Sequence, residues 1–323
     1  MVTRMQTYNN VSGQNQLSAE AAEFYQKAML ERLQEKVNYI HYGKKAPLPV
    51  HAGATTSWRR LEMPEAVTTA ISEGTTPDGL DLSINKIQST VAQYGAWTKI
   101  SDLLDLTGVD PLLTEVAEMF GDHAAVSMEK VIATVLAGGT NVLYGNNKTS
   151  RATLAAGDVL SAGDIARARN IMVSNNVPMV KTPGGQMGYI AFTHPDNITR
   201  LMTEANGPWA QFNAGGDSRG LDNFQSGSAG QMYGIHFVET TNVPAFTNAG
   251  SGNNLSGKST IIIGADAFGV PDVAGSSKPE ILVFSDGSTE NPMALYKTVA
   301  WKTCFAAVRL EEKRILRLES LDK

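Results

Sequence analysis

Apolar residues recur at three- and four-residue steps between Leu17 and Ile40, which predicts an amphipathic helix near the N-terminus. Ser18 is placed to cap its first turn. Glu23 lies four residues before Lys27, a spacing at which opposite charges support a helix. Because this helix precedes any apolar run long enough to form a core, we interpret it as an N-terminal arm.

From Lys44 to Leu104 the pattern changes to the alternation typical of strands. Residues 58–62 and 82–91 alternate apolar and polar side chains, and the Gly- and Pro-containing run 72–79 between them is a strong turn signal. The pattern predicts a long two-stranded excursion with a polar tip. A lone hairpin is at best marginally stable in water, so it needs a surface to lie on, which a neighbouring copy can provide.

A second helix is predicted from Asp110–Pro111 to Gly138–Gly139. Asp110 can cap it, Pro111 suits the first helical position, and the glycine pair ends it. About 28 residues at ~1.5 Å rise make a helix of ~42 Å, more than twice the average length.

The rest of the chain mixes short helical and strand patterns, which together predict an α+β protein with a compact α/β body and C-terminal strands. We expect helices over residues 162–173 and 196–205, and strands over 187–192, 234–239, 260–264, 281–284, 295–310 and 315–319, with a turn at 311–313.

Composition argues against several classes of protein. The formal net charge is -5, without the basic excess of a free nucleic-acid-binding domain. Charged residues make up 18%, below the ~25% of soluble domains, which favours a partly covered surface. Neither a signal peptide nor a membrane span is evident, so we expect assembly in a cytoplasm. The single cysteine, Cys304, lies in an apolar run and is predicted to be a buried thiol.

Residues 252–259 match the letters of a phosphate-binding P-loop, with Lys258 as its lysine. Such a site needs a strand before the loop and a helix after it, because the helix N-terminus binds the phosphates. We interpret residues 244–249 as a loop, and the β-branched run 260–263 favours a strand. The sequence therefore predicts a hairpin loop and no nucleotide site.

The sequence contains no other pattern that indicates catalysis, a metal site or a cofactor. The five histidines lack metal-ligand spacing. We expect His123 to be solvated or hydrogen-bonded and His194 to begin a helix. Acidic residues near the start of the long helix meet its positive end favourably; they are Asp102, Asp105, Asp110, Glu115 and Glu118.

Candidate contacts with a second copy lie on the excursion and the first helix. Arg59 and Arg60 are adjacent on a predicted strand and so point to opposite faces. One can meet a neighbour's carboxylate while the other meets solvent, and two ordinary surface arginines are an equal alternative. The full set of subunit-interface candidates is Trp58, Arg59, Arg60, Glu62, Glu73, Asp78, Phe24 and Leu33.

The order of these elements resembles the Hong Kong 97-type fold of tailed-bacteriophage major capsid proteins. Residues 94–104, 261–271 and 299–307 resemble stretches of the phage N-four-type coat protein family. The resemblance implies an N-arm (1–45), an extended loop (46–106), a peripheral domain with a long spine helix (107–145 with 276–323) and an axial domain (146–275).

The resemblance also implies a virion structural protein that self-assembles into pentamers and hexamers around double-stranded DNA, with a portal protein, a decoration protein as an optional partner, and no cofactor. Because the spine helix begins near residue 110, no long N-terminal scaffolding segment is expected, which predicts a separate scaffolding protein. Three alternatives stay open: an encapsulin-like nanocompartment shell, a P-loop enzyme, and a strand-built surface or tail protein.

Overall fold

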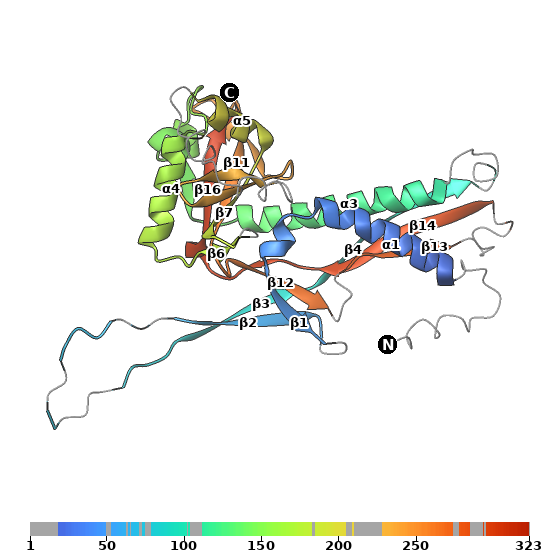
Figure 1. Ribbon diagram of the computed structural model, residues 1–323, viewed down its shortest axis with the longest axis horizontal. Helices are drawn as coiled ribbons and strands as arrows, with labels where there is room; N and C mark the ends of the chain where they lie inside the picture. The colour runs from blue at the N-terminus through green and yellow to red at the C-terminus, as the bar shows by residue number, and fades with distance from the viewer. Residues whose placement is uncertain are drawn as a thin grey trace.

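The computed structural model shows an α+β protein, in which a sheet-and-helix body continues into a long helical spine and a protruding hairpin (Figure 1). The longer helices of the described chain are α1 (Ala19–Lys36), α3 (Leu112–Ala137) and α4 (Ala162–Ser174). Helix α5 (Pro195–Thr203) is shorter. The structure describes residues 19–49, 53–62, 64, 66–70, 73–74, 79–101, 103, 112–182, 185–204, 209, 228–273, 278–284, 293 and 295–322.

The body contains an eight-stranded mixed sheet. Ile261, Ile262 and Ile263 of its central strand are fully buried, because α4 packs on one face of the sheet and the inner end of α3 on the other. Along the main path the strands are β5 (Val142–Tyr144), β16 (Ile315–Leu321), β11 (Leu255–Ile263), β7 (Met187–Thr193), β9 (Ile235–Glu239) and β8 (Ser228–Met232), with β10 (Ala245–Ala249) beside β11 and β6 (Val180–Lys181) beside β7.

Helix α3 is the spine of the molecule, and its 26 residues span ~39 Å at ~1.5 Å per residue. Helix α1 lies against it so closely that a Cβ on Gly121 would stand 2.5 Å from the Met29 carbonyl oxygen. A three-stranded sheet also packs on the spine, through Trp301 and Phe305. Its strands are β13 (Glu280–Phe284), β14 (Tyr296–Phe305) and β4 (Ala92–Ser101).

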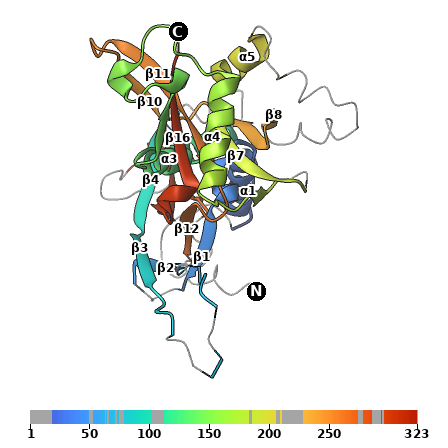
Figure 2. The same cartoon turned by 90° about the vertical axis from the view of Figure 1, so that its left-hand side faces the viewer.

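The hairpin β2 (Thr55–Leu61) and β3 (Ile84–Thr90) leaves the molecule from a small sheet at its base, and in two perpendicular views it extends away from everything else (Figures 1 and 2). The base sheet consists of β1 (Lys44–Leu48), β12 (Phe268–Val273) and β15 (Val308–Arg309). Four short 3-10 helices complete the described chain: η1 (Tyr39–Tyr42), η2 (Gly145–Asn147), η3 (Arg151–Thr153) and η6 (Glu312–Arg314).

The structure confirms the predicted long helix, the body helices and the C-terminal strands, and it corrects the excursion. Only β2 and β3 form the hairpin, whereas β4 pairs along its whole length with β14. The strand alternation of β4 is the same whichever strand it pairs with. Strand β16 likewise pairs with β11 and β5 of the body sheet and not with β14.

The N-terminal helix is shorter than predicted and is docked on its own chain. It ends at Lys36, and Lys36 Nζ lies 2.7 Å from an Asp122 carboxylate oxygen of the spine. Lys27 Nζ lies 3.7 Å from Glu31 Oε1, whereas the sequence pattern favoured a pair between Lys27 and Glu23. The predicted cap Ser18, and Asp110 and Pro111 before the spine, lie outside the described residues.

Two further expectations change in detail. Cys304 is half-buried, because alternate residues of β14 face the spine and Cys304 lies on the other face of the strand. Residues 245–249 form strand β10 where a loop was expected, since they pair antiparallel with β11.

Candidate assembly surfaces

The base of the hairpin is fixed to its own chain by one aromatic side chain. Trp58 is 7% exposed, and its indole lies over Gly269 of β12, where a Cβ would stand 2.7 Å from the ring. Only glycine leaves room for this contact. The side chain of Trp58, a candidate for contacts with a second copy, is thus covered by its own chain. Leu33, another candidate, is 9% exposed and packs between α1 and the spine, where it also lines the cavity described below.

The hairpin presents two different faces, as the Arg59–Arg60 pattern predicted. Arg60 is half-buried, and its guanidinium donates to Glu62 Oε1 at 2.9 Å, an oxygen that also accepts from the Asn85 side-chain amide at 2.5 Å. Arg59 is exposed on the opposite face. Arg59 is thus the arginine that is available to another molecule, while Arg60 and Glu62 neutralise each other.

The exposed face places like charges opposite each other. Arg59 of β2 is the direct cross-strand partner of Lys86 of β3, and both side chains are exposed. Like charges directly opposite in an antiparallel pair are destabilising. The next pair along the same face, Leu61 and Ile84, is apolar and also exposed. The charged pair does not stabilise the hairpin, and the apolar pair leaves more than half of each side chain exposed, so this face is suited to an external partner.

Large apolar side chains are concentrated on the outer hairpin. Leu61, Val67, Leu80, Leu82 and Ile84 all rank among the exposed large hydrophobic residues of the described chain. An exposed apolar group of this kind marks an interaction surface.

The remaining interface candidates lie as follows. Phe24 of α1 is 58% exposed, and Glu73 is exposed beyond the hairpin strands. Asp78 lies outside the described residues. Phe24 and Glu73 therefore stay candidates for contacts between copies.

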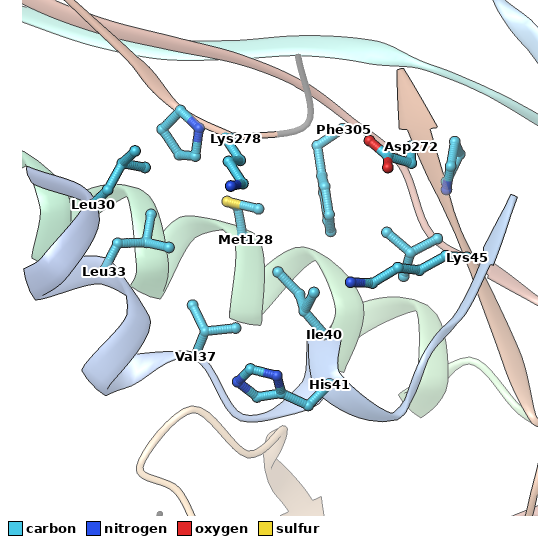
Figure 3. Close-up of a pocket in the computed structure, with 13 residues that line it drawn as sticks. Leu30, Leu33, Val37, Ile40, His41, Lys45, Met128, Asp272, Lys278 and Phe305 are labelled. Atoms are coloured by element: carbon cyan, nitrogen blue, oxygen red, sulfur yellow. The ribbon is translucent and has the colours of Figure 1, made fainter. Parts of the chain in front are cut away.

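A cavity of about 260 Å³ lies near the base of the hairpin, between α1, η1, the spine and β12 (Figure 3). Its walls are apolar and include Leu30, Leu33, Met128 and Phe305. Charged residues stand at its edge: Lys45 and Lys278, with His41 and Asp272. The cavity therefore combines an apolar interior with a mouth where cationic residues outnumber acidic ones.

The P-loop letters do not form a phosphate site. Residues 250–253 turn between β10 and β11, and Lys258 lies within β11. Its Nζ is 2.6 Å from Asp196 Oδ2 and 3.1 Å from His194 Nδ1, so the ammonium is bound to its own chain. The contact with Lys258 holds the pKa of Asp196 below its usual range. The predicted hairpin loop is confirmed.

The histidine expectations are also confirmed. His123 Nδ1 accepts a hydrogen bond from the Trp301 indole at 3.1 Å, and His194 caps α5 by accepting from the Asp196 amide. Within the described part of the chain, His, Cys, Asp and Glu side chains do not gather in threes to hold a metal ion. The helices that the structure describes are all too short or too polar to cross a membrane.

A buried carboxyl, which the sequence patterns did not single out, fixes the elbow between α1 and β1. Glu129 of the spine is fully buried, and its Oε1 accepts from the backbone amides of Asn38 at 3.0 Å and Tyr39 at 2.8 Å. Its Oε2 is buried without a hydrogen-bond partner among the described residues. Burial raises the pKa of Glu129 to about 7, although the two amides act to lower it.

Comparison with known proteins assigns the chain. The family model described as "Phage capsid protein" matches residues 85–312, which is more than two thirds of the chain. The chain belongs to the phage capsid protein family. It is a structural protein of the virion, a major capsid protein located in the icosahedral shell. Among the curated proteins, no significant match was found.

Solved structures show the same fold at low sequence identity. The capsid of Ralstonia phage GP4 is 16% identical, with a TM-score of 0.72 over 89% of this capsid protein and 92% of that chain. The head structure of Helicobacter pylori bacteriophage KHP40 is 12% identical, with a TM-score of 0.60 over 89% and 91%. A virus-like particle from Pyrococcus furiosus is 9% identical, with a TM-score of 0.54 over 93% and 99%. The expected Hong Kong 97-type fold is thus confirmed.

Proposed function

We propose that this capsid protein assembles into pentamers and hexamers through its β2–β3 hairpin, which lies across a neighbouring copy, and that the closed shell encloses double-stranded DNA. One observation carries the proposal: Leu61, Leu80, Leu82 and Ile84 are more than half exposed on a hairpin that extends away from its own body. Burying them against another copy gains the apolar free energy that folding alone leaves unused.

The chemistry of the chain supports a structural role without catalysis or a cofactor. The formal charge of -5 suits an inner wall that contains DNA without sequence-specific binding, because each neutralised phosphate would add affinity. Assembly in the bacterial host cytoplasm would further involve a separate scaffolding protein and a portal protein, with a decoration protein as an optional partner. Affiliation with the phage N-four-type coat proteins is part of the same proposal.

The four-part division is also a proposal: N-arm 1–45, extended loop 46–106, peripheral domain 107–145 with 276–323, and axial domain 146–275. The packing of β13 and β14 on the spine supports it. Strands β4 and β16 pair across its boundaries, with β14 and with β11 respectively, so these boundaries run through sheets.

A nanocompartment shell is the second candidate, favoured by the likeness to a virus-like particle over 93% of the chain. The two functions differ in what the particles contain. Particles from an infected host that hold genome-length DNA support the phage head. Particles that hold a cargo enzyme, from a gene next to the shell gene, support the compartment.

Electron microscopy of the expressed full chain, alone and with the products of its neighbouring genes, tests assembly. We expect closed icosahedral shells when a scaffolding protein is present. A variant in which residues 62–83 are replaced by an Asn-Gly turn should keep the unfolding temperature of the body and form no closed shells. Correct shells from the purified chain alone would argue against a separate scaffold. A stable monomer under all these conditions would refute the shell function.

A further inference from the structure

The outer part of the hairpin is strongly acidic. From Leu61 to Ile84 the chain has five acidic residues and no Lys, Arg or His. That charge equals the formal net charge of the whole chain, -5, so the remainder is electrically balanced. Such a segment repels itself and favours a cationic partner. The five acids are Glu62, Glu65, Glu73, Asp78 and Asp81.

The same segment, here called the hairpin tip (residues 61–84), also carries exposed apolar side chains. Leu80 and Leu82 are 57% and 68% exposed, and Asp81 between them is exposed too. Residues 79–83 are not part of a regular strand, so their side chains are not held to the two-residue alternation. A leucine and a neighbouring carboxylate can therefore turn toward the same partner.

The cavity near the hairpin base has the complementary chemistry. Its walls are apolar, and in Figure 3 the side chains of Lys45 and Lys278 reach toward it from two sides. Neither ammonium forms an ion pair with another described residue, whereas nearby Lys44 is paired with Asp266 at 2.8 Å. The volume of about 260 Å³ is far above the ~10–15 Å³ that one water needs on the same measure, so the cavity has room for a branched side chain.

The tip of the same molecule does not supply this partner. The hairpin strands run outward from the base, and residues 79–83 precede β3 at its outer end, away from the base sheet (Figures 1 and 2). A contact between the tip of one copy and the cavity of the next joins two different surfaces. Contacts of that kind close into rings when the rotation between copies allows it.

We propose that this cavity receives the hairpin tip of a second copy, with a leucine of the tip inside the cavity and a carboxylate of the tip beside Lys45 and Lys278. The inference rests on the proposed shell function and names the receiving surface for the hairpin. It places the receptor between the N-terminal helix and the spine, so α1 is held in place by the neighbour as well as by its own chain. The contact unites apolar burial with charges that select the register.

Charge exchange tests the pairing. The double variant Lys45→Glu and Lys278→Glu puts like charges together and should lower the yield of closed shells by about tenfold or more. Adding Asp81→Lys and Glu73→Lys to the same chain restores opposite charges and should recover most of the yield. The matched control is Lys130→Glu with Lys181→Glu, two exposed lysines away from the cavity, which should assemble like the unmodified chain.

Disulfide trapping tests proximity without relying on charge. In a Cys304→Ser background, Leu82→Cys with Leu30→Cys should give chains linked between copies when shells are oxidised, because a disulfide needs Cα atoms about 4.4–6.8 Å apart. Either substitution alone should give no linked ladder on a non-reducing gel. Circular dichroism of each variant before assembly checks that it is folded.

The outcomes separate this inference from the shell function. If shells form and the Lys45 and Lys278 reversal leaves their yield unchanged, the cavity is not the receptor, although the shell function stands. A loss of yield that the exchanged acids do not restore, or a disulfide to a scaffolding protein in place of a second copy, also overturns it. If the unmodified chain forms no shells at all, it is the proposed function that fails.

Discussion

The body sheet and the hairpin use similar strand residues in opposite circumstances. In β11, Ile261 to Ile263 are fully buried, because β16 and β7 flank the strand and helices cover both faces of the sheet. In the hairpin, Leu61 and Ile84 are 67% and 58% exposed, whereas Trp58 is 7% exposed. Apolar strand residues therefore do not by themselves stabilise a strand: what matters is whether the same chain supplies their cover.

The largest expected effect separates folding from assembly. Phe192 of β7 is fully buried and its ring centroid lies 4.1 Å from that of Tyr39, so Phe192→Ala should cost about 3–5 kcal/mol of unfolding free energy. The matched change Leu61→Ala, on the exposed hairpin, should alter the unassembled protein by less than about 0.5 kcal/mol. Chemical denaturation of the unassembled chain measures both.

The assembly readout should rank these two variants in the opposite sense. Leu61→Ala is expected to lower the yield of shells although the chain is folded. Equal losses of unfolding free energy in the two variants would show that the hairpin is packed on its own body, and the contrast between the two regions would disappear.

A second effect concerns pH and the elbow that Glu129 holds. Its pKa of about 7 in the folded chain lies above its ordinary value of 4.5, so the folded state binds the proton more tightly. The stabilisation is complete below pH ~4.5 and is lost as the pH rises through ~7, by about 3 kcal/mol in total. Tyr39 is the titratable neighbour that faces it, and its pKa is raised by burial and by Glu129.

Glu129→Gln isolates this contribution. The amide keeps an acceptor for the Asn38 and Tyr39 amides but cannot ionise, so the fall in unfolding temperature between pH 5 and 8 should become shallower. Glu118→Gln, exposed on the same helix, is the control and should follow the unmodified chain. Parallel curves for Glu129→Gln and the unmodified protein would contradict a buried titrating carboxyl.

Local patterns predicted the parts of the fold that depend on local physics. The spine is periodic and ends before Gly138, and the run Ile261–Ile263 favoured a strand strongly enough to reject the P-loop. Pairing partners are not local: the alternation of β4 is compatible with β3 or β14, and only the packed structure selects β14. The cavity is formed by residues far apart in the sequence, such as Lys45 and Phe305, so no pattern along the chain identifies it.

The smallest expected effect tests why the hairpin keeps Lys86 opposite Arg59. Lys86→Glu turns a repulsive cross-strand pair into an attractive one and should stabilise the hairpin by a few tenths of a kcal/mol to about 1 kcal/mol. If the exposed cationic face serves contacts between copies, the same change should reduce the yield of shells. Hydrogen exchange of the β2–β3 amides measures the stability of the hairpin, and electron microscopy measures the yield of shells.

The conservative change Lys86→Arg keeps the charge and should alter neither quantity. A variant that strengthens the hairpin and still assembles fully would mean that the paired cations have no role in contacts between copies. The exposed apolar pair Leu61 and Ile84 would then be the feature of this face that differs from the buried strands of the body.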